Sequence, residues 1–431
     1  MSKFWDEKFE TMPYEEMAKF QLAKLKETLA WVYEKVPFYR KTFDHAGLKP
    51  TSVGKLEDLA RFPFSIKNDL RDNYPFGLCA LPMKDLVRIH ASSGTTGKPI
   101  TGPYSREDRN QWANCMARTL YSHGVREDDL CQNAYGYGLF TGGLGFHLGA
   151  ELIGCAIVPT SSGLTERQIV IMQDFGSNVL FSTPTYALTI AEKAEKMGVD
   201  MKSLPLRVGC FGAEPWTPKM RDEIEKRMGI IAHEAYGLTE MMGPGVAFSC
   251  EARNLHINED HCYPEVIDPE TLQPLPMGET GELVFTALQR RAMPLIRYRT
   301  KDITRLVRTK CDCGRTLITM DKITGRDDDM LIISGVNVFP SQVESVIMEF
   351  KDMEPHYQIR VRKKGYLDVM LVEAEAKRVV YEAGKESVQK LADLISDRIL
   401  QVIGITVPIS IVPMNSIPRS EGKAKRVIDE R

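Results

Sequence analysis

The sequence lacks any uninterrupted apolar run long enough to span a bilayer, and its first residues, MSKFWDEKFETMPYEE, lack the apolar core of a secretory signal. It also lacks a strong charge of either sign, because the formal net charge is only -2 at pH 7. This balance gives no electrostatic reason to expect a nucleic-acid partner. Internal repeats and low-complexity tracts are missing too, so we expect a globular, cytoplasmic protein without a membrane partner.

What the chain does have is length and ordinary composition. With 431 residues, 43% of them hydrophobic and 26% charged, it is long enough to form two or three units, each with its own core. Nine cysteines are present, an odd number that excludes complete pairing within one chain. In a reducing compartment we expect free thiols or metal ligands rather than disulfides.

The spacing of apolar residues predicts an α/β protein. Residues 14–35 show helical spacing, which predicts an amphipathic helix. From Leu86 to Tyr236, short apolar runs that begin with LVRIHA alternate with helical segments, which predicts a largely parallel sheet with helices on its faces. Ser105 and Thr217 are expected to begin two of these helices. The expected helices are 105–123, 166–175, 185–197 and 217–228.

The pattern changes twice in the second half of the chain. Residues 245–325 contain strand-like runs broken by Gly, Pro and acidic turns, which predicts a β-rich, more antiparallel subdomain. We therefore predict a large N-terminal domain at 1–327 and a small α+β C-terminal domain at 328–431. The C-terminal elements are expected as a helix at 341–350, strands at 357–363 and 367–376, a helix at 385–403 and a strand at 407–413.

The strongest motif is SSGTTGKP, which follows the predicted strand LVRIHA. Small hydroxyl residues, glycines and a lysine leave backbone N–H groups and hydroxyls free to surround a phosphate chain. In a Walker loop Gly-Lys opens a helix, whereas here Pro99 and a strand-like segment follow. A flexible surface turn is the alternative. The candidate phosphate ligands are Ser92, Ser93, Gly94, Thr95, Thr96, Gly97 and Lys98.

This loop resembles the corresponding loop of the adenylate-forming superfamily of acyl-CoA synthetases, adenylation domains and luciferases. The segment HEAYGLTE at 233–240 resembles a second motif of the same superfamily. The resemblance implies that Tyr236 packs on adenine, Thr239 contacts the α-phosphate and Glu240 holds Mg²⁺, for which one carboxylate suffices. FGAEP at 211–215 is similar to the family segment that lines the adenine site. The nucleotide-binding residues implied by both segments are Gly212, Ala213, Glu214, Pro215, Glu234, Ala235, Tyr236 and Gly237.

Two further segments fit the same resemblance. YRTKD at 298–302 implies that Asp302 grips the ribose hydroxyls, with Arg326 of GRDDD alongside. The family usually has Gly where this chain has Lys301, which leaves the aspartate in register. A structural Asp–Arg pair is the alternative interpretation.

The C-terminal PRSEGKAKR resembles the family segment that carries the catalytic lysine, which implies that role for Lys423. A lysine cation suits a reaction in which charge builds on phosphate oxygens. A solvated basic tail is the alternative, and Lys425 is a competing assignment. The family rotates its small C-terminal domain, which implies a mobile domain with its hinge at Asp328. The run MLIISGVNVFPSQVE implies coenzyme A contacts from Ser334 and Gly335.

Aromatic residues within the Gly-rich NAYGYGLFTGGLGFHLG at 133–149 predict a flat slot for an aryl group, because glycines let a ring approach the backbone. The rings in question are those of Tyr135, Tyr137 and Phe140, and for each of them filling the core is the alternative. With this segment the resemblance narrows to phenylacetate-CoA ligases and covers nearly the whole chain. The implied substrate-binding residues are Tyr135, Phe140, Thr141, Gly142, Gly212 and Gly237.

Three cysteines and a histidine flank the β-rich region: Cys250, His256, Cys311 and Cys313. Three thiolates and one imidazole satisfy tetrahedral zinc, and a closed set of four ligands predicts a structural site. Buried free thiols are the alternative. His261 and Cys262 lie close enough in sequence to compete as ligands.

Together, the motifs predict an ATP-dependent aryl acid–CoA ligase. Carboxylate and ATP give acyl-AMP and pyrophosphate, and coenzyme A then takes the acyl group and releases AMP. The implied cofactors are ATP, Mg²⁺, coenzyme A and structural Zn²⁺, and the resemblance implies a homodimer. The same chemistry on indoleacetate, benzoate, a deazaflavin cofactor or a carrier protein is one alternative. A non-catalytic nucleotide-binding protein is another, because fold alone does not prove activity.

Overall fold

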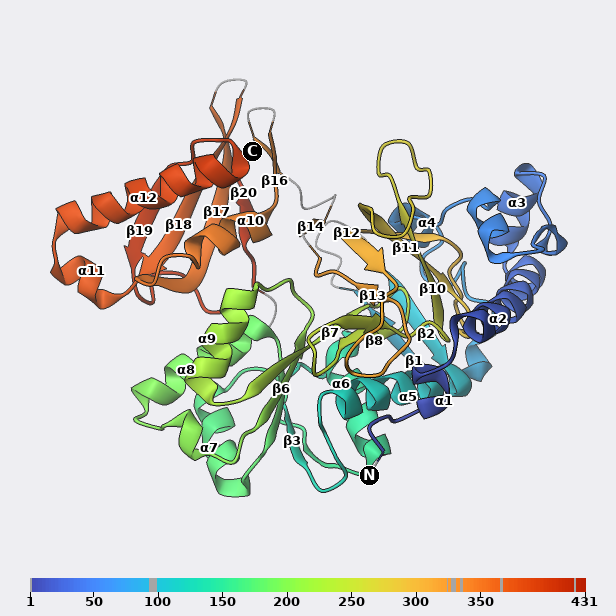
Figure 1. The fold of residues 1–431 in the computed structure, drawn as a ribbon, viewed down its shortest axis with the longest axis horizontal. Helices are drawn as coiled ribbons and strands as arrows, with labels where there is room; N and C mark the ends of the chain where they lie inside the picture. Colours follow the sequence, from blue (N-terminus) through green and yellow to red (C-terminus); the bar gives the residue numbers. More distant parts are fainter. Residues whose placement is uncertain are drawn as a thin grey trace. The chain divides into compact units, whose positions relative to one another are not determined.

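The computed structural model describes residues 2–92, 99–323, 325–326, 331–333, 336–364, 367–421 and 424–431. The chain divides into two compact units (Figure 1). The first comprises Met1–Ser182, Leu204–Ala213 and Ile231–Lys322, and the second comprises Thr183–Ser203, Glu214–Ile230 and Ile323–Arg431. The last division falls close to the boundary predicted at 327. However, the second unit also includes two segments from the earlier part of the chain.

One large mixed sheet organises the first unit, and its strands follow the order β10-β11-β12-β13-β9-β8-β7-β6-β5-β3-β4. Strands β4, β3, β5, β6 and β7 pair in parallel, while the strands from β7 to β10 pair antiparallel. The predicted α/β class is confirmed, and the β-rich region proves continuous with the parallel strands. The strands are β3 Leu130–Asn133, β4 Ala156–Val158, β5 Val179–Ser182, β6 Val208–Gly212, β7 Ile231–Leu238, β8 Gly243–Ser249, β9 Leu255–Ile257, β10 Cys262–Ile267, β11 Thr280–Ala287, β12 Tyr298–Val307 and β13 Thr319–Met320.

The strand LVRIHA does not belong to this sheet. It forms β1 (Leu86–Ala91), which pairs antiparallel with β2 (Thr101–Ser105) in a separate two-stranded sheet. Expecting it among the parallel strands was wrong, because residues 92–100 are too few for the crossover of about a dozen residues that parallel pairing needs. The SSGTTGKP segment therefore joins the two strands of a hairpin.

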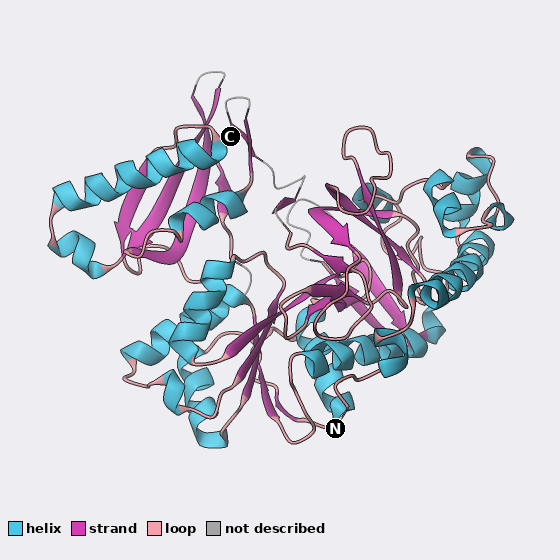
Figure 2. Cartoon of the chain, in the orientation of Figure 1, coloured by secondary structure: helices cyan, strands magenta, loops and turns pink. Residues whose placement is uncertain are grey.

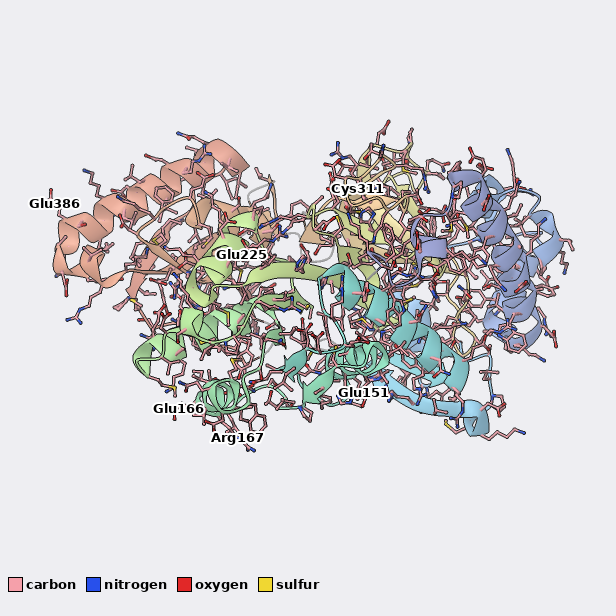
Figure 3. All side chains as sticks on the ribbon, turned by 60° about the horizontal axis from the view of Figure 1, so that its bottom comes forward. Glu151, Glu166, Arg167, Glu225, Cys311 and Glu386 are labelled. Atoms are coloured by element: carbon pink, nitrogen blue, oxygen red, sulfur yellow. The ribbon has the colours of Figure 1, made fainter. Side chains whose placement is uncertain are left out.

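Helices of the first unit begin and end where local signals place them. Helix α2 buries Met17, Leu25 and Val32 along one face, as the helical spacing predicted. Ser105 caps α5 in a capping box with Asp108. Charged residues of α6 and α7, namely Glu151, Glu166 and Arg167, point outward (Figure 3). The α-helices are α1 Glu7–Glu10, α2 Tyr14–Lys35, α3 Pro37–His45, α4 Lys67–Asp72, α5 Arg106–Ser122, α6 Thr141–Ile153 and α7 Thr165–Phe175, and short 3-10 helices span Pro50–Ser52, Leu56–Arg61 and Met83–Asp85.

Helix α6 is the main element that the sequence did not predict, because glycine disfavours helices. Its glycines instead let α6 pack closely on its neighbours. A Cβ atom at Gly145 would lie 2.6 Å from the Trp112 ring, and one at Gly149 would lie 2.6 Å from Met116 Cβ. Both contacted residues belong to α5. Tertiary packing therefore overrides local propensity here.

The second unit contains a four-stranded sheet of order β19-β18-β17-β20. Helices α10 and α12 lie along one face of this sheet (Figure 2), and Val343, Ile395 and Ile399 join Ile359 and Val372 in its core. Thr217 caps α9, as predicted. Among the described residues, no helix combines the length and apolar character that a bilayer span requires. The elements are α8 Pro184–Lys196, the 3-10 helix Met201–Ser203, α9 Pro218–Met228, β14 Gly325–Arg326, β15 Leu331–Ile333, β16 Val336–Val338, α10 Pro340–Ile347, β17 Met353–Lys364, β18 Leu367–Ala376, α11 Arg378–Glu382, α12 Lys385–Ile403, β19 Ile409–Pro413 and β20 Val427–Asp429.

Candidate functional site

Of the SSGTTGKP segment, the structure describes Ser92 and Pro99, which lie between β1 and β2 in the sequence. At the base of this connection, Ser92 N–H donates to the Ile100 carbonyl (2.8 Å), and Ile100 N–H donates to Ser92 Oγ (3.0 Å). These reciprocal bonds fix Ser92, which is half-buried. The other predicted residues of this motif, together with several from the C-terminal part, lie outside the described residues: Ser93, Gly94, Thr95, Thr96, Gly97, Lys98, Asp328, Ser334, Gly335, Lys423 and the side chain of Arg326.

Strand β2, which follows the SSGTTGKP segment, lies against the end of the HEAYGLTE segment. A Cβ atom at Gly102 would lie 3.2 Å from both Thr239 Cγ2 and the Thr239 carbonyl oxygen. Arg290 joins the same two segments, because its guanidinium donates to the carbonyls of Glu240 (2.7 Å) and Pro103 (3.2 Å). Strand β2 and the end of the HEAYGLTE segment, which are far apart in sequence, therefore meet in the first unit.

Two carboxylates approach this place from β12 and from the turn after β7. Tyr236 O–H donates to Asp302 Oδ2 at 2.5 Å, and Tyr298 O–H donates to Glu240 Oε1 at 3.3 Å. Both carboxylate residues are buried. Each tyrosine occupies one lone-pair direction of its carboxylate, and a carboxylate has about four such directions. The tyrosine hydroxyls therefore orient two buried acidic groups, and carboxylates are groups that accept hydroxyl donors and bind hard cations.

Glycines let the backbone of β6 and β7 come close together. A Cβ atom at Gly212 would lie 2.2 Å from the Ala235 carbonyl oxygen, and one at Gly237 would lie 1.9 Å from the Gly243 carbonyl oxygen. Any side chain at either position would therefore displace backbone. Ala213, which follows Gly212, adopts a left-handed φ of 73°. The sheet edge thus presents backbone surface here.

Two acidic residues of these segments have specific partners. Glu234 pairs with Lys322 at 3.1 Å, while its N–H donates to Ser249 Oγ (2.8 Å). Glu214 belongs to the second unit, as does the exposed Pro215. The Glu214 carboxylate accepts the N–H groups of Thr185 (2.7 Å) and Ala424 (2.9 Å). Its described contacts therefore include the C-terminal tail.

The aromatic residues after β3 have different environments. Tyr135 is buried and stacks on Phe146, with ring centroids 4.7 Å apart and planes at 13°. A Cβ atom at Gly142 would lie 3.3 Å from the Tyr135 ring, and one at Gly212 would lie 3.8 Å from its hydroxyl. Tyr135 therefore extends along the wall formed by glycines of two segments, next to Ala235.

Two other predicted substrate-binding residues, Phe140 and Thr141, lie at the start of α6. Phe140 is 55% exposed, whereas Thr141 is buried. A Cβ atom at Gly243 would lie 2.7 Å from Thr141 Cβ, so Thr141 reaches the backbone that also approaches Gly237. Tyr137 takes a separate role, because its hydroxyl accepts from Asn133 Nδ2 (2.7 Å) and bonds His147 Nδ1 (3.0 Å). Burial raises the pKa of Tyr137 to about 12.

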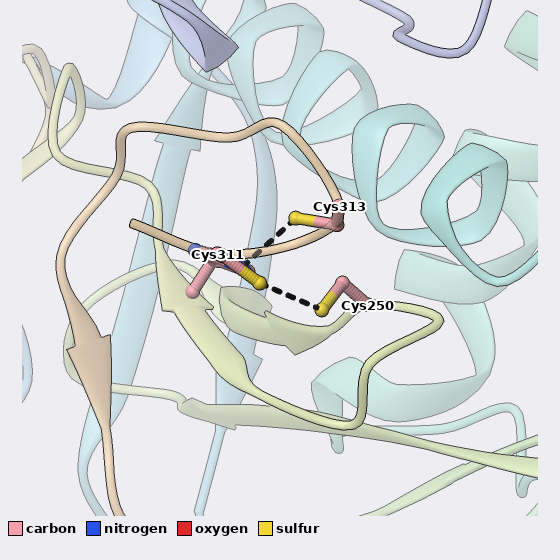
Figure 4. A group of neighbouring side chains, drawn as sticks. Cys250, Cys311 and Cys313 are labelled. Carbon is pink, nitrogen blue, oxygen red and sulfur yellow. Dashed lines mark hydrogen bonds between the residues drawn. The ribbon is translucent and has the colours of Figure 1, made fainter. Parts of the chain in front are cut away.

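The predicted metal ligands come together from three segments. The ligand atoms of Cys250, His256, Cys311 and Cys313 all lie within 4.8 Å of one another, and all four residues are buried. Figure 4 shows the three cysteine side chains converging. Cys250 Sγ lies 3.7 Å from Cys311 Sγ, and Cys313 Sγ lies 3.3 Å from His256 Nε2. The competing residues contact other groups: His261 lies 3.4 Å from Asp260, and Cys262 donates to Asn258.

This geometry fits zinc. Tetrahedral Zn–S bonds of about 2.3 Å imply sulfur atoms about 3.8 Å apart, which agrees with the Cys250–Cys311 distance of 3.7 Å. His256 Nδ1 bonds the Leu317 carbonyl at 3.1 Å, which leaves Nε2 facing the cysteines. Hydrogen bonds with Cys250 and His256 lower the pKa of Cys313 below that of a free thiol. The thiolate is the form that binds metal.

Arg290 is the residue of this site that the sequence did not reveal. Its guanidinium also donates to the Met241 carbonyl and lies 4.9 Å from the centroid of the Tyr104 ring. Its partners are mostly backbone carbonyls of segments distant in sequence, so no local pattern marks it. Arginine supplies five donors in a planar fork, which suits a group that joins several segments.

Two family models match the chain. Residues 27–289 match the model described as AMP-binding enzyme, and residues 335–431 match the AMP-binding enzyme C-terminal domain. Among curated proteins, the chain is 49% identical to the phenylacetate-coenzyme A ligase of Escherichia coli, over 98% of this chain and 97% of that protein. It is 46% identical to the phenylacetate-coenzyme A ligase of Thermus thermophilus, over 98% of each chain.

Among solved structures, the chain is similar to a 2-hydroxyisobutyryl-CoA ligase in the postadenylation state in complex with 2-HIB-AMP. The TM-score is 0.94 at 29% sequence identity, over 100% of this chain and 93% of that chain. The same ligase in the thioesterification state, in complex with 2-HIB-AMP and CoA, gives a TM-score of 0.75 at 30% identity, over 99% and 92% of the chains.

Proposed function

This chain belongs to the AMP-binding enzyme family, and on that premise we propose that it is an AMP-forming ligase that joins phenylacetate, or a close aryl analogue, to coenzyme A. The carboxylate oxygen of the acid attacks the α-phosphorus of ATP, and pyrophosphate leaves. The sulfur of coenzyme A then attacks the acyl carbonyl of the resulting adenylate, and AMP leaves. The thiol proton is lost to solvent or base.

Three contacts within the first unit support this proposal: Thr239 against Gly102, Tyr236 with Asp302, and Tyr298 with Glu240. We assign the ribose hydroxyls to Asp302, whose carboxylate Tyr236 orients. Glu240 offers a hard, buried oxygen donor that fits Mg²⁺, and such an ion would neutralise phosphate charge when bound. Thr239 is assigned to the α-phosphate, and Lys423 to the charge that develops on the reacting oxygens.

The aryl specificity rests on Tyr135. Its ring lies against Gly142 and reaches Gly212, so the slot wall combines an aromatic face with bare backbone. A flat ring can approach such a wall closely. The two curated relatives described above are both phenylacetate-coenzyme A ligases, which supports the same acid for this chain.

Pyrophosphate release with a panel of carboxylic acids, with and without coenzyme A, tests the proposed function. Phenylacetate should give the highest kcat/KM, pyrophosphate should appear without coenzyme A, and AMP should require it. A higher kcat/KM for indoleacetate or benzoate would show that this acid, and not phenylacetate, is the preferred substrate. Pyrophosphate release that is independent of any acid would refute the ligase. Lys423→Ala should block adenylate formation yet still transfer the acyl group from supplied phenylacetyl-adenylate.

We also propose that Cys250, His256, Cys311 and Cys313 hold a structural Zn²⁺. Four buried ligands leave no open position for substrate, so the ion would stabilise the loops that carry them. Metal analysis of protein purified without chelator should find one zinc per chain. As the family resemblance implies, we propose a cytoplasmic homodimer, for which light scattering should give twice the chain mass.

A further inference from the structure

A buried network of charges in the second unit joins helix α8 to the C-terminal tail. At its centre, Arg419 Nε lies 2.9 Å from Glu192 Oε2, and its two terminal nitrogens lie 2.8 Å from the two oxygens of Glu375. Glu192 belongs to α8 and Glu375 to β18, and both residues are buried. The Arg419 side chain is only 17% exposed. Arg419 therefore links two elements that are far apart in sequence.

The network continues beyond Arg419. His356, at the start of β17, places Nε2 2.5 Å from Glu192 Oε1. Burial by itself would raise the pKa of Glu192, but His356 and Arg419 lower it to about 2. Both oxygens of Glu192 thus have a cationic or hydrogen-bonding partner. Glu192 is the position at which α8, the four-stranded sheet and the tail meet.

Carboxylates of the second unit anchor the tail on both sides of residues 422 and 423. Before them, Ile417 N–H donates to Glu375 Oε1 (2.8 Å), and Arg419 donates to the Ile417 carbonyl (3.0 Å). After them, Ala424 N–H donates to Glu214 Oε2 (2.9 Å). The tail therefore contacts two carboxylates: that of Glu375 on β18 and that of Glu214, which also accepts the Thr185 N–H. Lys423 lies between these anchors in the sequence.

Stability alone does not explain such an arrangement. Buried ion pairs repay their desolvation only when their geometry is good, and apolar residues of similar size often stabilise a fold equally well. What an ion-pair network adds is a defined geometry, because every oxygen and nitrogen must meet its partner.

We propose that Arg419 is a positioning residue for the first half-reaction, because with Glu192 and Glu375 it sets the place of the tail that carries Lys423. This inference rests on the proposed ligase function. It assigns Arg419 no contact with substrate. Its effect is confined to adenylate formation, the step that the Lys423 cation serves, and acyl transfer from a finished adenylate does not need it.

The test compares the two half-reactions in Arg419→Gln. Pyrophosphate release without coenzyme A should fall roughly 100-fold, the loss expected when a reacting group is misplaced by about 1 Å. Transfer from supplied phenylacetyl-adenylate to coenzyme A should stay near wild type. Arg419→Lys should recover part of the lost rate, because it restores the charge but not the two-pronged contact. The matched control is Arg398→Gln, which removes an exposed pair with Glu349 in the same unit and should change neither half-reaction.

Hydrogen exchange of the Ile417 and Ala424 amides gives a readout that needs no activity. Both should exchange faster in Arg419→Gln than in wild type and in Arg398→Gln. Equal losses in both half-reactions, or unchanged rates and exchange, would overturn the positioning role. If Arg419→Gln does not fold, Glu192→Gln retains the Glu375 pair and must show the same selective loss. A wild-type protein that releases no pyrophosphate refutes the ligase function instead, while the exchange data still test the anchoring.

Discussion

Two groups of converging side chains in the first unit differ in how completely they contact one another. The Cys250, His256, Cys311 and Cys313 atoms face each other within 4.8 Å, and each residue is buried. Asp302 and Glu240 instead accept the hydroxyl groups of Tyr236 and Tyr298, which lie on β7 and β12. The first group is a closed set of four candidate metal ligands, whereas the second consists of acidic groups that tyrosine hydroxyls orient.

The difference indicates a structural role for the cysteine and histidine group and a functional role for the two carboxylates. A closed set of ligands satisfies a metal completely and contributes to folding. Carboxylates that side-chain hydroxyls orient can accept hydrogen bonds from ligands that bind and dissociate. Substitutions in the closed group should therefore lower stability, and substitutions among the carboxylates should lower activity with little change in stability. The expected effects below run from largest to smallest.

The largest effect is expected from Glu240→Gln. The amide keeps the shape and accepts the Tyr298 hydrogen bond, but it lacks the negative charge that we assign to Mg²⁺. Loss of such an electrostatic group should lower the rate of adenylate formation roughly 100-fold or more. The Tm should change little. Glu166→Gln on the outer face of α7 is the matched control (Figure 3). Normal adenylation by Glu240→Gln would exclude Glu240 from the site.

A loss of stability is expected from Cys313→Ser. Serine is a poor zinc ligand, so the remaining buried thiols and His256 lose the ion that we propose. The free energy of unfolding should fall by about 3 kcal/mol or more, and zinc content should fall with it. Cys79→Ser changes a half-buried thiol outside the cluster and should alter neither quantity. Full stability with no zinc in either wild type or variant would favour buried free thiols.

A smaller, purely functional effect is expected from Tyr236→Phe. The change removes the hydroxyl that donates to Asp302 and leaves the ring in place. A less firmly oriented carboxylate should raise the KM for ATP about fivefold, in line with one lost hydrogen bond of about 1 kcal/mol. Tyr14→Phe, at an exposed tyrosine of α2, is the control. An unchanged KM would separate the Tyr236 hydroxyl from nucleotide binding.

The sequence predicted those parts of the fold that depend on neighbours along the chain. The helix N-caps at Ser105 and Thr217 and the buried face of α2 are local patterns, and each appears in the structure as expected. The four spaced Cys and His residues also come together. Motif resemblance also predicted that segments around Tyr236 and Asp302 would share a site, and the two side chains do meet.

Features that depend on distant contacts were missed. Helix α6 forms despite its glycines, because distant residues such as Trp112 and Met116 pack so closely that only glycine fits there. Arg290 and Arg419 follow no repeating pattern, and each gains its role from partners that folding brings near. The β1 strand was placed in the wrong sheet because its apolar run gave no sign of its partner.

The smallest effect is expected at Lys301, which adjoins Asp302 but pairs with Glu282, so its substitution should affect stability and not nucleotide binding. Its Nζ lies 3.5 Å from the buried Glu282, and its backbone adopts φ 68°, a left-handed conformation that costs a non-glycine residue roughly 1–2 kcal/mol. Lys301→Ala and Lys301→Gly both remove the ion pair, but only glycine relieves the backbone. After allowing for the greater flexibility of glycine when unfolded, urea unfolding should find Lys301→Gly more stable than Lys301→Ala by about 0.5–1 kcal/mol. The KM for ATP should match wild type in both, because the pair with Glu282 supports the strand and not the ribose. Equal stabilities of the two variants would show that the strand holds this conformation without strain. A raised KM for ATP would show that Lys301 contributes to nucleotide binding.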